Sequence, residues 1–180
     1  MVLTLRKRQR AGFTIVELLI VVVVIAILAA ISVVAYSGIQ DRARNAKMNA
    51  DLTQLEKAIQ AARVNTGKVL KDITGSGCTS CACRAKSVSP DLSVLDKETD
   101  SCWTGYATAL SRISTASGMS VTNLIDPWGR PYYMDENEQE QSATYGPCGI
   151  GKDSIGNLIV RTGIWVADNG RSIQYLTPGC

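Results

Sequence analysis

The feature that most constrains this chain is an unbroken apolar run near its N-terminus. Every residue from Leu18 to Ile31 is apolar, and with Ser32 tolerated the run extends over 18 positions to Ala35. A helix that crosses the hydrocarbon core of a bilayer needs about 20 such residues. The downstream sequence has the mixed composition of a water-soluble domain. We therefore predict a membrane-spanning helix over residues 13–36, followed by an exported part.

Basic residues stand immediately before the apolar run. Residues 1–12 carry a charge of +4 although the whole chain carries only +3, and residues 67–180 hold 10 Lys and Arg against 12 Asp and Glu, or −2. Positive charge beside an apolar segment holds that end in the cytoplasm. The basic excess therefore belongs to a leader, residues 1–12, and indicates no direct nucleic-acid binding. The basic residues of the leader are Arg6, Lys7, Arg8 and Arg10.

A glycine, a phenylalanine and a lone carboxylate open the apolar run, in the segment Gly12-Phe-Thr-Ile-Val-Glu17-Leu-Leu-Ile. The small Gly12 at the membrane boundary gives a protease access to the backbone. Glu17 costs roughly 2.5 to 3.5 kcal/mol at the centre of a bilayer and less near its edge, so it needs a partner. Cleavage after Gly12 would create one, the new α-amino group of Phe13 in a neighbouring copy of the chain.

These residues resemble the class III signal of type IV prepilins and of the related pseudopilins of type II secretion and competence systems. The resemblance implies that a membrane-embedded prepilin peptidase cuts between Gly12 and Phe13 and that Phe13 is then N-methylated. It also implies that Glu17 is the residue that directs subunit assembly. Two plainer interpretations remain: an ordinary secretory signal cut near Val33-Val34-Ala35, and a membrane anchor with an incidental Glu17. A glutamate inside the apolar region disfavours the secretory signal.

The apolar run continues into an amphipathic segment without a turn signal. No proline occurs between Phe13 and Gly67, so the sequence predicts one helix of about 54 residues that ends at Gly67 and bends most easily at Gly38. Residues 37–66 are its amphipathic half, with apolar residues every three or four positions. The expected apolar stripe consists of Ile39, Ala43, Ala46 and Ala50, continued by Leu52, Leu55, Ile59 and Ala62.

Residues 67–180 read as a globular α+β head of short elements. Tyr106 to Ser117 is predicted to be a helix, and Asp168-Asn169-Gly170 is predicted to be a hairpin turn. Together with the resemblance, this pattern indicates a pilin fold, in which the long helix packs on a small antiparallel sheet. The expected strands are Arg130 to Asp135, Ser142 to Tyr145, Leu158 to Ala167 and Ser172 to Leu176.

All six cysteines lie in the part expected to be exported, where disulfides form. Fifteen pairings are open. A zinc site and a redox pair at Cys78 to Cys81 are weaker alternatives, because the chain has no histidine and no βαβ pattern surrounds that spacing. Cys81 and Cys83 are too close to suit a bond with each other, so we expect different partners. The six are Cys78, Cys81, Cys83, Cys102, Cys148 and Cys180.

The segment Asp126-Pro-Trp-Gly-Arg-Pro-Tyr-Tyr133 resembles one common in major pseudopilins. Its two prolines and glycine predict a rigid bend before a strand, with Trp128 as a cover over the core. In that family an acidic loop further on binds calcium. Here only Asp153 stands in the comparable stretch, so no cofactor is expected and calcium is a minor alternative.

The sequence therefore predicts a structural subunit and not an enzyme. By the resemblance, it is a pilin of a type IV pilus-like filament that polymerises with its own copies. An inner-membrane assembly platform and its ATPase would extract it from the plasma membrane into an extracellular or periplasmic filament. The alternatives are a pseudopilin of a type II secretion or competence pseudopilus and a monomeric, membrane-anchored extracellular binding domain.

Overall fold

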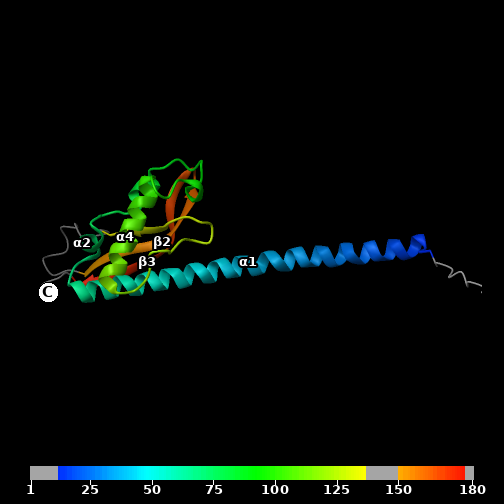
Figure 1. Ribbon diagram of the computed structural model, residues 1–180, viewed down its shortest axis with the longest axis horizontal. Helices are drawn as coiled ribbons and strands as arrows, with labels where there is room; N and C mark the ends of the chain where they lie inside the picture. The colour runs from blue at the N-terminus through cyan, green and yellow to red at the C-terminus, as the bar shows by residue number, and fades with distance from the viewer. Residues whose placement is uncertain (1–11, 137–149, 177–180) are drawn as a thin grey trace, which may run out of the picture. The chain divides into compact units, whose positions relative to one another are not determined.

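The computed structural model describes residues 12–136 and 150–176 (Figure 1). The predicted strand Ser142 to Tyr145, Cys148 and Cys180 lie outside the described residues, as does the leader up to residue 11. The predicted α+β class is confirmed: helices are followed by a small antiparallel sheet. The elements are α1 (Ile15–Thr66), α2 (Leu70–Thr74), α3 (Cys81–Arg84), the 3-10 helix η1 (Leu92–Val94), α4 (Ser101–Ser117), β1 (Tyr132–Asp135), β2 (Ile150–Arg161) and β3 (Ile164–Leu176).

The long helix α1 has 52 residues, close to the predicted length. It ends where the sequence indicated, because Gly67 adopts a left-handed φ of 66°. The N–H of Gly67 donates to the carbonyl of Arg63 at 2.8 Å and thereby closes the last turn. The chain divides between Ala43 and Arg44 into two compact units, which are described separately below.

In the second unit, α1 buries one face in the core of the head. The buried positions recur at intervals of four and three residues, as one face of a helix requires. They belong to a cluster that also includes residues of α4 and all three strands. The predicted positions Leu52, Leu55, Ile59 and Ala62 are confirmed as core, together with Met48 and Ala58.

The first part of the predicted stripe does not belong to the core of the head. Ile39, Ala43, Ala46 and Ala50 are all exposed in the single chain. Ala46 lies two residues before the buried Met48, and Ala50 lies two residues before the buried Leu52. Residues two positions apart lie on different sides of a helix, so the two alanines point away from the core.

Helix α4 begins at Ser101, five residues before the predicted start at Tyr106. The signal that sequence analysis missed is Asp100, whose carboxylate accepts the N–H of Cys102 at 2.8 Å and caps the helix. Gly118, with a φ of 71°, ends α4 after Ser117 as predicted.

The sheet has the order β1-β2-β3, with both pairs antiparallel. The predicted strand Arg130 to Asp135 is confirmed, with β1 starting two residues later at Tyr132. The predicted strand Leu158 to Ala167 is wrong, because the chain reverses inside it. Arg161 pairs with Ile164 across a two-residue turn in which Thr162 and Gly163 have φ values of 50° and 78°. Positive φ at both central positions matches the twist of a hairpin.

The predicted turn Asp168-Asn169-Gly170 is also wrong, since it lies inside β3. Ile155 pairs with Arg171 and Asn157 with Asp168, so Gly156 alone stands opposite two residues in a β-bulge. A Cβ added to Gly156 would lie 2.8 Å from the carbonyl oxygen of Asp168, closer than the two strands allow. The asparagine–glycine pair therefore forms the two-residue side of the bulge. The predicted strand Ser172–Leu176 is the end of β3 and not a separate strand.

Candidate processing and assembly site

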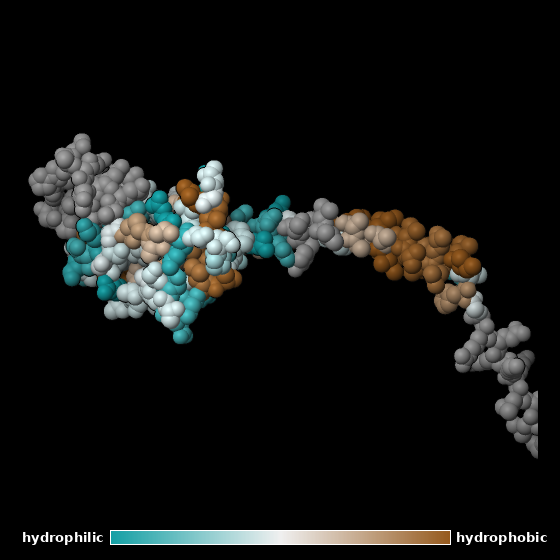
Figure 2. All heavy atoms as spheres, turned by 90° about the horizontal axis from the view of Figure 1, so that it is seen from above, coloured by the Kyte–Doolittle hydropathy of each residue, from teal (hydrophilic) through white to brown (hydrophobic). Residues whose placement is uncertain are grey.

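The first unit presents a long apolar surface. The helical stretch Ile15–Ser32 is long and apolar enough to cross a membrane, and none of its residues is buried in the chain (Figure 2). Phe13, just before it, is 87% exposed. A water-soluble domain rarely leaves such a continuous apolar surface uncovered, which indicates that lipid or other helices cover it.

Glu17 has a partner in its own helix. The N–H and the hydroxyl of Thr14 both donate to Oε2 of Glu17, at 2.8 and 2.7 Å. In return, the N–H of Glu17 donates to the Thr14 hydroxyl oxygen at 3.2 Å. This reciprocal arrangement is a capping box, which satisfies backbone donors that the first turn of a helix leaves free.

Thr14 therefore supplies Glu17 with hydrogen bonds from its own helix, a partner that sequence analysis did not name. Sequence analysis could have found Thr14, since a threonine three residues before a glutamate at the start of an apolar run is the capping-box pattern. Hydrogen bonds from a neutral threonine leave the charge of the carboxylate in place. Ser32, the other polar residue of the stretch, donates to the carbonyl of Leu28 at 2.8 Å, so its hydroxyl is also satisfied within the helix.

Gly12 is not required by the packing of the described chain. A Cβ added there would meet no atom within 4 Å, and the residue is exposed. The position therefore accepts a larger side chain as far as the fold is concerned.

In the head, the segment after α4 forms the predicted rigid bend. Asp126 is buried, and its Oδ1 accepts the N–H groups of Trp128 and Arg130 at 2.9 and 2.8 Å. Its Oδ2 pairs with the Arg130 guanidinium at 3.0 Å. The predicted role of Trp128 as a cover over the core is wrong: its side chain is 42% exposed and stacks with Arg44 and Arg130, whose guanidinium carbons lie 5.9 and 5.2 Å from the ring centre.

Asp153, the minor calcium candidate, lies in β2 and not in a loop. It is fully buried and forms an ion pair with Arg63 in the last turn of α1. Its charge is therefore compensated by a protein cation. Across residues 12–136 and 150–176, no three His, Cys, Asp or Glu side chains gather into a group that could hold a metal ion.

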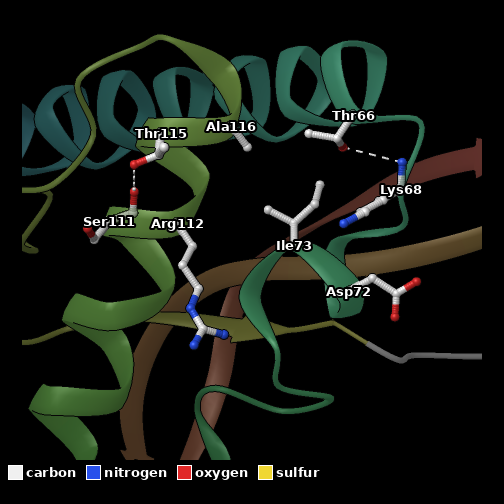
Figure 3. Close-up of a pocket in the computed structure, with 8 residues that line it drawn as sticks. All are labelled: Thr66, Lys68, Asp72, Ile73, Ser111, Arg112, Thr115 and Ala116. Carbon is white, nitrogen blue, oxygen red and sulfur yellow. Dashed lines mark hydrogen bonds between the residues drawn. The ribbon is translucent and has the colours of Figure 1, made fainter.

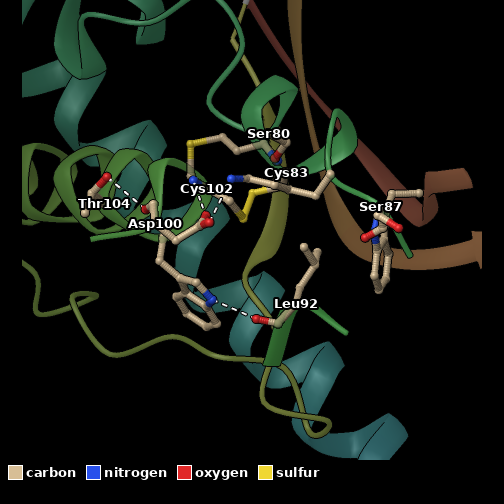
Figure 4. Close-up of a disulfide and its surroundings, with 11 residues drawn as sticks. Ser80, Cys83, Ser87, Leu92, Asp100, Cys102 and Thr104 are labelled. Carbon is tan, nitrogen blue, oxygen red and sulfur yellow. Dashed lines mark hydrogen bonds and ion pairs between the residues drawn. A yellow bond between two sulfur atoms is a disulfide. The ribbon is translucent and has the colours of Figure 1, made fainter. Parts of the chain in front are cut away.

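The described cysteines form two disulfides, Cys78–Cys81 and Cys83–Cys102. Cys81 and Cys83 have different partners, as predicted. The Cys83–Cys102 bond lies beside the α4 cap, where Asp100 accepts the N–H of Cys102 (Figure 4). Both of its cysteines are buried, so this bond joins α3 to α4 inside the head.

An open cavity of 550 Å³ lies between α2, α4 and the end of α1 (Figure 3). Ile73 lines it, and Figure 3 shows this side chain between Lys68 and Arg112. The carboxylate of Asp72 points away from Ile73. The lining residues are Thr66, Lys68, Asp72, Ile73, Ser111, Arg112, Thr115 and Ala116.

Comparison with known proteins shows what the N-terminal segment is similar to. Residues 7–33 match the family model of the prokaryotic N-terminal methylation motif, a stretch that includes Gly12, Phe13 and Glu17. The chain is also similar to the type II secretion system core protein G of Aeromonas hydrophila, with 25% identity over 130 residues, which cover 72% of this chain and 76% of that protein. No solved structure matches the chain.

The chain thus combines an apolar N-terminal helix, whose start is similar to the N-terminal methylation motif, with a small α+β head. Both matches support the prepilin and pseudopilin family, to which the segment from Gly12 to Ile20 also points.

Proposed function

We propose that this chain is a structural subunit of a pilus-like or secretion filament and that it polymerises through its N-terminal helix. The observation that carries the proposal is the contrast between the two units. The head buries its apolar side chains in its own core, whereas the stretch Ile15–Ser32 buries none. Lipid covers that stretch while the subunit is stored in the plasma membrane, and neighbouring helices cover it in the filament.

Processing comes first in this proposal. A prepilin peptidase cuts between Gly12 and Phe13, and the new amino group of Phe13 is methylated. Two observations support this order: the match to the methylation motif and the lack of any packing reason for glycine at Gly12. The peptidase would require a small residue there because it must bind the backbone at that point.

Assembly then depends on the charge of Glu17. Thr14 satisfies hydrogen bonds of Glu17 but carries no charge, so the carboxylate still benefits from a cation. The α-amino group of Phe13 in a neighbouring subunit supplies that cation when two helices lie side by side. An inner-membrane platform and its ATPase, which the family implies, would move subunits from the membrane into the filament.

One specific observation favours the narrower assignment to a secretion pseudopilus. The similar protein of Aeromonas hydrophila is described as a core protein of a type II secretion system, and the similarity covers most of both chains. The segment from Asp126 to Tyr133 agrees with this assignment. The disulfides in the head suit a fibre exposed outside the cell, which is the long-pilus alternative.

The test is the intact mass of the protein recovered from membranes and from sheared surface material. We expect a chain that begins at a methylated Phe13 and sediments as filaments. A chain that begins at Met1, or after residues 33–35, would overturn the processing step. A correctly processed chain that stays monomeric in the membrane would instead support an anchored extracellular binding domain.

A further inference from the structure

The two described disulfides differ sharply in accessibility. Cys83 and Cys102 are 1% and 0% exposed, whereas Cys81 is an exposed residue and Cys78 is half-buried. The two bonds also close loops of different length, with sequence separations of 3 and 19 residues. Because a disulfide restrains the unfolded chain less when its loop is short, the exposed bond contributes less to stability than the buried one.

The loop between Cys78 and Cys81 is held in place by hydrogen bonds that do not involve sulfur. The N–H of Thr79 donates to Oε2 of the buried Glu136 at 2.7 Å, and the Thr79 hydroxyl donates to Oε1. Ser80 pairs with β1 in both directions: its N–H donates to the carbonyl of Met134 at 3.0 Å, and the N–H of Met134 donates to its hydroxyl at 2.6 Å. Opening the disulfide would therefore leave its two cysteines close together and ready to close again.

The surroundings of the bond suit thiol chemistry. Cys78 lines a cavity of 410 Å³ together with Thr79, Ala82 and Arg112. Within the described residues, Arg112 is the cavity's one charged lining residue. The Arg112 guanidinium donates to the carbonyl of Thr74 and borders the same cavity as Cys78. A guanidinium in such a cavity stabilises a thiolate over a thiol, and a stabilised thiolate leaves faster in disulfide exchange.

We propose that Cys78–Cys81 is an exchange-active disulfide that accepts two electrons from an external dithiol, while Cys83–Cys102 stays closed. A thiolate of the dithiol attacks Sγ of Cys81, the bond between Cys81 and Cys78 breaks, and Cys78 leaves as a thiolate at the cavity that Arg112 also lines. The second thiolate of the dithiol then attacks the dithiol's own sulfur in the mixed disulfide and releases Cys81. The dithiol ends as a disulfide, and its two protons reach Cys78 and Cys81 through water.

The test uses the full processed chain in detergent micelles, with dithiothreitol as the probe dithiol. Samples are quenched with N-ethylmaleimide at intervals, and peptide mapping reports each cysteine separately. We expect Cys78 and Cys81 to be labelled together at least about 100-fold faster than Cys83 and Cys102, while the near-UV circular dichroism stays native. Equal rates for the two bonds, or opening of Cys78–Cys81 only after the native signal is lost, would overturn the proposal.

A second measurement separates an active site from simple exposure. Arg112→Gln should slow the opening of Cys78–Cys81 by about 3- to 10-fold and shift its pH profile toward alkaline values, because the Cys78 thiolate loses its cation. Arg84→Gln is the matched control, since Arg84 is exposed on the neighbouring α3 but does not line the cavity. Equal rates for Arg112→Gln and Arg84→Gln would refute the role of Arg112. They would show that Cys78–Cys81 opens only because it is exposed.

Discussion

Arg63 in the last turn of α1 and Asp153 in β2 form an ion pair in which Asp153 is fully buried and Arg63 is only 11% exposed. The pair joins the end of the long helix to the central strand of the sheet. Its partners are 90 residues apart in sequence. Removing one partner of a buried pair leaves the other charge in a poorly solvated place, which costs far more than breaking a surface pair.

Asp153→Asn should therefore lower the free energy of unfolding by about 3 kcal/mol or more, because Arg63 keeps its charge without a counter-charge. Thermal or denaturant unfolding in micelles, followed by near-UV circular dichroism, measures the change. Asp168→Asn is the matched control, since the Arg161–Asp168 pair on the same sheet is 64% and 33% exposed and should matter by less than about 1 kcal/mol. Equal effects of the two variants would contradict this account.

Calcium should leave the stability of the head unchanged. The carboxylate of Asp153 is already paired with Arg63, and hard cations need several oxygen ligands. Unfolding midpoints measured in calcium and in EDTA are expected to coincide. A calcium-dependent rise of several degrees would show that a site forms with residues that sequence reasoning did not identify.

Two substitutions of Glu17 separate its charge from its role in the helix cap. Glu17→Gln keeps a carbonyl oxygen that can accept from Thr14 but loses the charge, whereas Glu17→Ala loses both. If the charge neutralises Phe13 of a neighbour, both variants should insert normally and lose filaments by roughly 100-fold or more, because an unpaired buried ammonium costs about 3 to 5 kcal/mol. Filament yield by sedimentation of sheared material is the measurement, with processing at Gly12 checked by mass.

The discriminating outcome is the behaviour of Glu17→Gln. Wild-type filament yield from this variant would assign the function of Glu17 to the cap and sink the proposed intersubunit charge contact. Thr14→Ala provides the complementary variant, since it removes the cap and keeps the charge. It should cost about 1 kcal/mol of helix stability and reduce assembly less than Glu17→Gln does.

Gly12→Val should block cleavage without disturbing the fold. No atom lies within 4 Å of a Cβ at this position, so the substitution removes only the small size that the peptidase is proposed to need. Intact mass should show the leader retained in a chain that still inserts into the membrane. The matched control is Gly38→Val, at a second glycine with open space around it, which should be processed normally.

The free energy of unfolding of the head should fall as the pH rises, because Glu136 loses its proton. Burial raises the pKa of Glu136 from 4.5 to about 7, even though hydrogen bonds from Thr79 act in the opposite direction. The folded state therefore holds the proton more tightly than the unfolded state does. The stabilisation is fully present below pH 4.5, and it declines as the pH rises toward and through about 7.

The decline attributable to Glu136 should total about 3 kcal/mol, and it should be absent in Glu136→Gln. Unfolding free energies at a series of pH values from 4 to 8.5 provide the measurement. Glu98→Gln, at an exposed position, is the matched control and should keep the pH dependence of the wild type. A wild-type stability that rises between pH 5 and 7 would refute the assignment.

The sequence alone determined the N-terminal half of this protein, because every relevant signal there is local. The apolar helix that is long enough to cross a membrane follows from continuous apolar residues, and the end of α1 follows from Gly67 and the absence of proline before it. The capping box of Thr14 and Glu17 involves residues three apart, so it was also readable in principle. The same is true of the bend at Asp126, in which the bonded groups are at most four residues apart.

The tertiary structure alone decided the features that depend on residues far apart in the chain. Asp168-Asn169-Gly170 suits a turn by composition, and it became a bulge because Gly156 on the opposite strand lets the backbones approach closely. The pairing of Cys83 with Cys102, and of Asp153 with Arg63, required the helices and strands to be packed first. Local sequence limits which conformations a segment can adopt, but the partner of a buried charge or thiol is set by whichever group packing brings within reach.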